Sequence, residues 1–318
     1  MTVMYVVALS LYRGVSYEEV LSCVLEGWRW LDLPGYTVAT KGAYYRNWLT
    51  VAFDGTTLSV PDSKKNAAAF GYASEPQYAS YPLVRCECLC ETGTHAPLAA
   101  AIGPYVTGEK ELARRLLSSL KPGMLLLADR EYLSYDFWED CLATGADLVW
   151  RVTRSWKLEK HEVLSDGSWL TTILCKEGPD KGKQRTVRVV HYSVEGSTDT
   201  YRLVTSILDP EQAPALELAS VYTQRWEIES AFDEMKTHLR GARSHLRSKL
   251  PELVEQEFWG LMIAHRAIRA LMHEAALKHN KDPDELSFVS AVRIVRRTLP
   301  SRADFSPSEA PEMEAGNT

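Results

Sequence analysis

A polar stripe on one long predicted helix constrains this chain more than any other feature. Residues 215–240 follow Pro214 and precede Gly241, which are good start and stop signals for a helix. Apolar residues recur on one face of that helix at helical spacing: Val221, Ile228, Phe232, Met235 and Leu239. A second stripe beside them is polar and consists of Tyr222, Arg225, Glu229 and Lys236. Taken alone, such a stripe is typical of a solvated face with ion pairs between neighbouring turns.

The spacing of the four polar residues, Tyr-x2-Arg-x3-Glu-x6-Lys, resembles the signature of the IS4 family of bacterial insertion-sequence transposases. The surrounding words YTQRWEIE, KTHLRGAR and LRSK are also similar to that family. The resemblance implies an RNase H-like core in which Glu229 is the third acid of an Asp-Asp-Glu triad. Two aspartates are then expected earlier in the chain.

Asp54 is the candidate for the first acid. Residues 48–53 form a short apolar, β-rich run, and Asp54-Gly55 ends it. The C-terminal end of a strand is where α/β sheets place functional groups, although an Asp-Gly pair alone more often marks a turn. The phrase AFDGTTLSVPDSKKNAAAFG resembles the first-aspartate block of the family, which implies that Asp54 is a metal ligand. Asp62, in a Pro-Asp-Ser turn of the same phrase, is expected to be structural.

Asp129 is the candidate for the second acid. It follows residues 124–128, MLLLA, a continuous apolar run typical of a strand buried on both faces. The chain before it predicts a hairpin and a helix, at residues 81–90, 96–102 and 109–120. In an RNase H-like sheet the strand ending at Asp129 lies parallel to and beside the strand ending at Asp54. Two carboxylates brought together repel unless a cation lies between them.

Residues 153–207 are rich in predicted strands and turns, similar to the β insertion that the family carries between its second aspartate and its glutamate. Three tryptophans lie near its start, Trp150, Trp156 and Trp169, and packing inside the protein is the commoner fate of such residues. Stacking on an unpaired base is the alternative. A helix is expected at residues 135–143 and a strand at 147–152.

Residues 236–249 are basic and contain no acid, which makes them candidates to contact DNA phosphates. The cations of this basic run are Lys236, Arg240, Arg243, Arg247 and Lys249. Helices are expected to follow at 251–276 and 288–299, with His265 a buried core residue. The tail at 301–318 is rich in Ser, Pro and Glu and is expected to be disordered.

Three features depart from the family pattern. The predicted N-terminal helical region, residues 1–43, joins the core abruptly near Ala43-Tyr44, where another helical stretch is expected. Glu131 stands where the family usually has glycine, and the tail is acidic where a basic end is expected. These departures favour a copy that keeps the metal site but is impaired in choosing DNA ends.

Composition adds weaker constraints. The 318 residues are 45% hydrophobic and 25% charged, as in a soluble globular protein, and the net charge of −6 neither demands nor excludes DNA binding. Cys86, Cys88 and Cys90 alternate along a predicted strand, so their thiols share one face, and buried reduced thiols are expected. That fits a reducing cytosol. The apolar residues 1–12 are too few to span a bilayer, which takes about 20 residues.

We therefore predict an α/β protein: an RNase H-like mixed-sheet catalytic core at residues 44–250, with a β-rich insertion at about 153–207 and flanking helices, including C-terminal helices at 251–300. The resemblance implies a cytoplasmic DDE transposase. It would cut insertion-sequence ends and join the freed 3′-OH to target DNA with two Mg²⁺ ions, for which Mn²⁺ would substitute. Asp54, Asp129 and Glu229 would hold these ions.

The expected partners are the terminal inverted repeats, target DNA and a second copy of the chain on DNA, with no membrane partner. The DNA-contacting residues would be Tyr222, Arg225, Lys236, Arg240, Arg243 and Arg247. Two alternatives stay open at this point. One is another RNase H-like DNA nuclease, such as a resolvase, that performs no strand transfer. The other is a degenerate transposase remnant that binds DNA without transposing.

Overall fold

The computed structural model describes residues 44–74, 81–193, 200–240 and 245–301, with side chains described up to residue 297. The helical region predicted at 1–43 and nearly all of the tail predicted at 301–318 lie outside these ranges. In the part of the chain that is described, no helix is long and apolar enough to cross a membrane.

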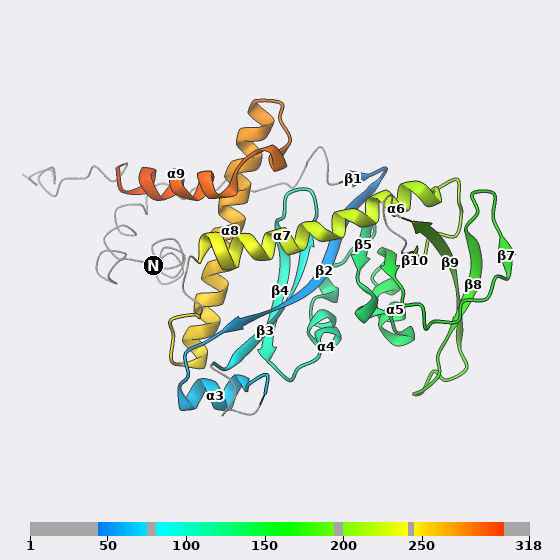
Figure 1. The fold of residues 1–318 in the computed structure, drawn as a ribbon, viewed down its shortest axis with the longest axis horizontal. Coiled ribbons are helices and arrows are strands. Elements are labelled where there is room, and N and C mark those ends of the chain that lie inside the picture. The colour runs from blue at the N-terminus through cyan, green and yellow to red at the C-terminus, as the bar shows by residue number, and fades with distance from the viewer. Residues whose placement is uncertain (1–43, 75–80, 194–199, 241–244, 302–318) are drawn as a thin grey trace, which may run out of the picture.

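One mixed sheet organises the molecule (Figure 1). Its strands are β1 (Tyr44–Tyr45), β2 (Trp48–Ser59), β3 (Leu83–Glu91), β4 (Pro97–Pro104), β5 (Met124–Ala128), β6 (Asp147–Arg151), β7 (Glu162–Val163), β8 (Trp169–Leu174), β9 (Gln184–Ser193) and β10 (Thr200–Thr205). Their order is β4-β3-β2-β5-β6-β10-β9-β8-β7, and β1 pairs with β2. β2, β3 and β4 are antiparallel neighbours, whereas β5 lies parallel to both β2 and β6.

β5 is the central strand, and its sequence explains its place. Leu125, Leu126 and Leu127 are all fully buried because helices cover both faces of the sheet here. The parallel pairing of β2 with β5, expected from the family resemblance, is present and ends at the pair Ala52↔Leu127. β2 itself continues to Ser59, so the prediction that Asp54 ends its strand was wrong. Asp54 instead lies within β2, just beyond the last residue that pairs with β5.

Helices cover the two faces of the sheet (Figure 1). The helices of the described residues are α3 (Lys64–Phe70), α4 (Glu109–Arg114), α5 (Tyr135–Leu142), α6 (Ala215–Thr223), α7 (Glu227–Asp233), α8 (Pro251–Lys278) and α9 (Phe288–Ser301), of which α9 packs against α8. α4 and α5 pack on one face, against side chains such as Phe53 and Trp150. α6, α7 and α8 pack on the other, against Ala52 and the cysteines of β3. The sulfurs of Cys86 and Cys88 are 3.5 Å apart and buried, as predicted.

The predicted helix at 215–240 is not one regular α-helix. α6 passes through a 3₁₀ turn (Gln224–Trp226) into α7, and α7 passes into a π-helical segment (Glu234–Leu239). In that segment the Arg240 N–H donates to the Met235 carbonyl, five residues back. The predicted apolar stripe is nevertheless confirmed, because Val221, Ile228, Phe232, Met235 and Leu239 are all buried. Irregular helical turns of this kind recur at functional sites.

The β-rich stretch after β6 extends the sheet. β10 runs antiparallel to β6, and β9, β8 and β7 follow outward from it. Trp150 is fully buried and Trp169 nearly so, which confirms the prediction that they pack inside the protein. Trp156 is partly buried against the core cluster that contains Trp150.

Gly145, which follows α5, packs closely against the turn that precedes β5. Gly145 has φ +84°, and an added Cβ would lie 2.7 Å from Cγ of Pro122 in the turn before β5. Gly123 has φ +83° but has nothing within 4 Å of such a Cβ. Gly123→Ala should therefore cost only the backbone term of about 1–2 kcal/mol, and Gly145→Ala clearly more. Urea unfolding of the two variants measures this, and an equal destabilisation of both would contradict the packing described.

Candidate active site

Residues from five segments of the chain meet where the pairing of β2 with β5 ends. β2 supplies Asp54, and the turn after β5 supplies Asp129. α6 supplies Tyr222, the 3₁₀ turn after it supplies Arg225, and α7 supplies Glu229. The structure thus brings the predicted acids to one region of the protein, on the face of the sheet that α6 and α7 cover.

Arg225 lies between these acids. Its side chain is only 4% exposed, its Nη2 donates to Oε1 of Glu229 at 3.2 Å, and its Nη1 is 3.9 Å from Oδ2 of Asp54. Burial disfavours the charge, but Tyr222, Asp129 and Asp54 nearby favour it more, so the pKa of Arg225 is raised. The stripe is therefore not a solvated face. Arg225 is a buried cation near carboxylates from β2, the turn after β5 and α7.

Asp54 is a carboxylate in an unfavourable setting. Its pKa is raised to about 6 in all: burial is the largest cause and the nearby Glu229 and Glu109 add to it, whereas Arg225 and the hydrogen bond from the Gly55 amide oppose it. The ionised form thus has too little positive charge around it. A divalent cation would supply that charge, and the oxygen donors present are those that Mg²⁺ prefers.

Asp129 caps the short 3₁₀ helix Arg130–Tyr132, where its Oδ1 accepts from the Arg130 amide at 2.5 Å. The Tyr222 hydroxyl donates to the Ala128 carbonyl at 3.2 Å, and burial raises the pKa of Tyr222. Tyr222 therefore fastens α6 to the end of β5, immediately before Asp129. The side chain of Glu131 is 70% exposed, so the residue that replaces the expected glycine extends into solvent.

The cations predicted to contact DNA differ in their burial and in their hydrogen-bond partners. Lys236 Nζ donates to the Thr56 hydroxyl, and burial lowers the pKa of Lys236. Burial also lowers the pKa of Arg240. The Arg247 amide donates to Oε2 of Glu257 at 2.8 Å. Arg243 lies outside the described residues.

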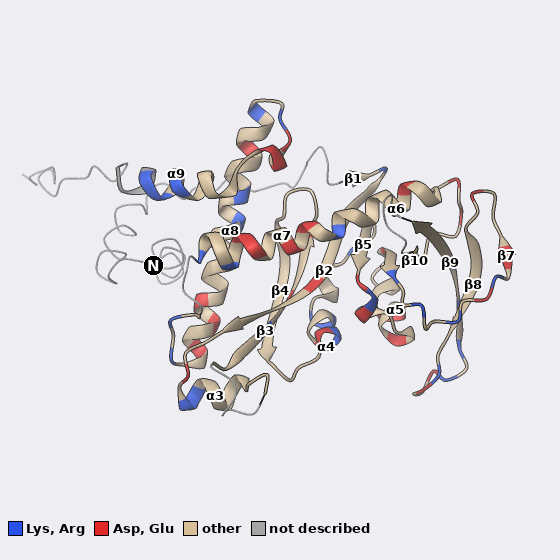
Figure 2. Ribbon diagram, viewed as in Figure 1, with Lys and Arg blue, Asp and Glu red and all other residues tan. Residues whose placement is uncertain are grey.

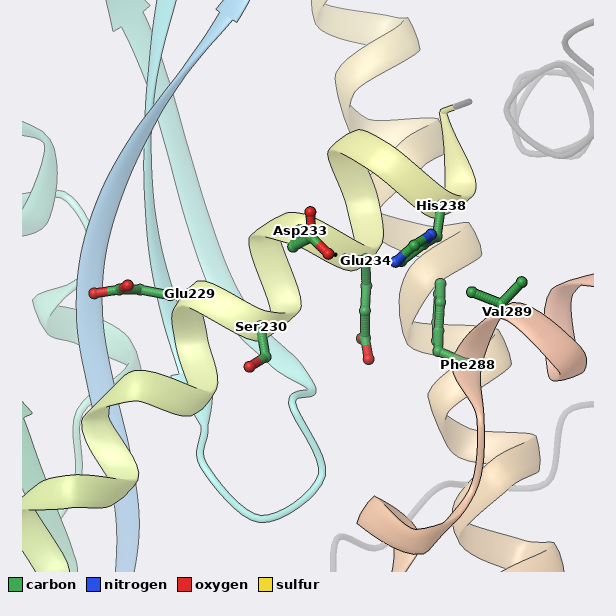
Figure 3. Close-up of a pocket in the computed structure, with 7 residues that line it drawn as sticks. All are labelled: Glu229, Ser230, Asp233, Glu234, His238, Phe288 and Val289. Atoms are coloured by element: carbon green, nitrogen blue, oxygen red, sulfur yellow. Dashed lines mark ion pairs between the residues drawn. The ribbon is translucent and has the colours of Figure 1, made fainter. Parts of the chain in front are cut away.

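An acidic pocket of about 400 Å³ adjoins Glu229, between α7 and α9 (Figure 3). Its lining residues are Glu229, Ser230, Asp233, Glu234, His238, Phe288 and Val289. In Figure 3 the Glu229 side chain extends across β2, away from the others. Acidic residues follow one another along α7, whereas α9 carries basic ones (Figure 2).

A second polar cluster was not predicted from the sequence. Ligand atoms of His95, Glu227 and Asp284 all lie within 4.8 Å of one another, and within the described ranges no other trio of such residues is this close, the predicted triad included. His95 Nε2 is 2.8 Å from Oε2 of Glu227 and 3.5 Å from Oδ1 of Asp284. Arg225 explains the wider spacing of the predicted triad, because its guanidinium occupies the space beside Asp54 and Glu229.

The His95 cluster already contains a cation. Arg269 on α8 contacts His95, pairs with Glu234 and lies 3.8 Å from Oδ1 of Asp284. His265 is fully buried and lies 2.8 Å from Glu234, which confirms it as a core histidine. These contacts anchor α7 and the π-helical segment after it to α8. The sequence signal for them was the seven-residue spacing of Glu227 and Glu234 and the four-residue spacing of His265 and Arg269.

The raised pKa of Asp54 predicts a pH dependence of stability in metal-free protein. The folded state holds this proton more tightly than the unfolded chain, so the extra stability is complete below about pH 4 and is lost as the pH rises through 6. The shift corresponds to at most about 3 kcal/mol. Denaturant unfolding between pH 4 and 7 with a chelator present measures it. Asp54→Asn should flatten the profile, and an unchanged slope would contradict the assigned burial.

Comparison with known proteins assigns this chain to a family. The family model described as "Transposase DDE domain" matches residues 49–266, which contain all three predicted acids and the Tyr222, Arg225 and Lys236 positions. The transposase InsG for insertion sequence element IS4, from Escherichia coli (strain K12), is 32% identical over 287 residues. That alignment covers 86% of this chain and 64% of the relative, so the chain spans less than two thirds of the relative's length.

A solved structure supports the fold. The piggyBac transposase in its synaptic complex with hairpin DNA superimposes with a TM-score of 0.53 at 14% identity, over 86% of this chain and 56% of that one. The fold likeness agrees with the family match. So does the resemblance to the IS4 family, which was drawn from the Tyr-Arg-Glu-Lys spacing. The chain belongs to the transposase DDE domain family.

Proposed function

We propose that this chain is a DDE transposase of the IS4 type, which cuts DNA at insertion-sequence ends and joins the freed 3′-OH to target DNA. The observation that carries the proposal is the convergence of Asp54 and Glu229 on Arg225, with Asp129 close enough to raise the pKa of that arginine. A mixed sheet in which β2 and β5 run parallel supports an RNase H-like core for this site.

Asp54, Asp129 and Glu229 would hold two Mg²⁺ ions, with Mn²⁺ as a substitute. Bound there, such ions supply Lewis-acid stabilisation to the attacking and leaving oxygens of an in-line phosphoryl transfer. The donor set fits this assignment, because all three ligands are carboxylates and Asp54 is short of positive charge. The His95 cluster fits a metal less well, since Arg269 already contacts His95.

The neighbouring cations would bind the DNA backbone. The guanidinium of Arg225 has the planar fork that suits two phosphate oxygens, and its buried Nε has no hydrogen-bond partner among the described residues. Binding DNA would require its Nη groups to exchange Asp54 and Glu229 for the phosphate. Lys236 would add a second contact beside Thr56. Tyr222 would contribute by holding α6 against β5. We further propose that the partners are transposon ends, target DNA and a second copy of the chain.

The first test of this function is Mg²⁺-dependent nicking of plasmid DNA. Asp54→Asn, Asp129→Asn and Glu229→Gln should each lower the nicking rate by more than about 100-fold, since loss of a group that merely supports a ligand already costs 10–100-fold. Circular dichroism should show that each variant remains folded. Asp62→Asn is the matched control, because Asp62 accepts a hydrogen bond from Tyr72 away from the site and should leave the rate unchanged. Wild-type nicking by Asp129→Asn would refute the triad.

The second test concerns the basic run. Neutralising Arg243 and Arg247 to glutamine should weaken binding to all duplex sequences alike, and should reduce the slope of log K against log salt by about 0.9 for each DNA phosphate that the variant no longer neutralises. Lys278→Gln is the control, because Lys278 pairs with Glu274 at the end of α8. A slope equal to that of the wild type would place these arginines off the DNA path.

Strand transfer separates this proposal from a plain nuclease. A DNA end with a free 3′-OH, incubated with a plasmid target, should yield joined product. Nicking without any joined product would favour an RNase H-like nuclease that performs no transfer.

A further inference from the structure

Glu87 is a buried carboxyl group to which the proposed mechanism gives no role. It lies on β3, is fully buried, and is the cross-strand partner of Gly55, the residue after Asp54. The glycine makes room for it, because a Cβ at position 55 would lie 2.9 Å from Oε2 of Glu87. Since side chains alternate across a strand, Glu87 belongs to the sheet face that α4 and α5 cover.

On that face Glu87 is bound to the turn that carries Asp129. The hydroxyl of Tyr132 donates to Oε1 of Glu87 at 2.7 Å, with both residues buried. Tyr132 is the last residue of the 3₁₀ helix that Asp129 caps. Its ring also stacks on Phe53, the residue before Asp54, with centroids 6.1 Å apart. Tyr132 therefore contacts Phe53 on β2 and Glu87 on β3, and these two contacts fix the turn that begins at Asp129.

The surroundings of Glu87 favour its neutral form. Burial raises its pKa well above the ordinary value, and the nearby Glu109 and Asp54 raise it further, while the bond from Tyr132 lowers it less. The neutral acid still offers Oε1 as an acceptor. What the contact requires is thus an sp² oxygen at this position, which glutamine also provides.

We infer that Glu87 is a positioning residue for the metal site: through Tyr132 it holds the turn that sets the place of the Asp129 carboxylate. The inference rests on the proposed function, since it assigns Asp129 to the metal. Groups that orient a ligand in this way influence metal affinity by about 10–100-fold, although they do not touch the ion.

The test is direct Mn²⁺ binding by the full chain, measured by electron paramagnetic resonance and independent of DNA cleavage. Glu87→Leu and Tyr132→Phe should each raise the Mn²⁺ Kd by about 10-fold or more. Glu87→Gln should stay within about twofold of the wild type, because its amide oxygen still accepts from Tyr132. Tyr132→Phe keeps the test valid if Glu87→Leu fails to fold.

Tyr45→Phe is the matched control for removal of a tyrosine–glutamate hydrogen bond. Tyr45 donates to Oε2 of Glu217 at 2.8 Å, beside the start of β2, and removing this bond should leave the Mn²⁺ Kd unchanged. A wild-type Kd in Tyr132→Phe, while Asp129→Ala still abolishes binding, would overturn the positioning role alone. Failure of the wild-type chain to bind Mn²⁺ would overturn the role and the proposed metal site together.

Discussion

The candidate site depends on one buried cation, the guanidinium of Arg225. A charge so far from water is stable only because Asp54 and Glu229 lie beside it and Asp129 is near. The same contact keeps the three acids in one place when no other cation is present. Arg225 thus links β2, the end of β5 and α7, and removal of its charge would leave these neighbouring carboxylates without a compensating cation.

Much of this arrangement could be predicted from local patterns. The MLLLA run predicted a strand buried on both faces, and the apolar stripe of residues 215–240 predicted which side of the helix meets the sheet. The Tyr-Arg-Glu-Lys spacing then indicated the residues on the adjoining face. The burial of Arg225 could not be read from that spacing, because a solvated ion-paired helix has the same pattern.

The remaining features depend on contacts between distant segments. β2 continues past Asp54 because it pairs with β3 as far as Ser59↔Leu83. The Asp-Gly pair does not reveal this, because it more often marks a turn. The His95–Glu227–Glu234–Arg269 network joins a hairpin, α7 and α8, and no single segment shows it. Glu87 likewise looks like any polar residue of an alternating strand until Tyr132 reaches it from the turn after β5.

The proposed site requires that Asp54, Asp129 and Glu229 bind the metal ions together. Anomalous diffraction from crystals of the chain with Mn²⁺ and duplex DNA tests it most directly, because the scattering locates manganese without reference to activity. We expect anomalous peaks between these three carboxylates. A peak at His95, Glu227 and Asp284, with none at the triad, would contradict it.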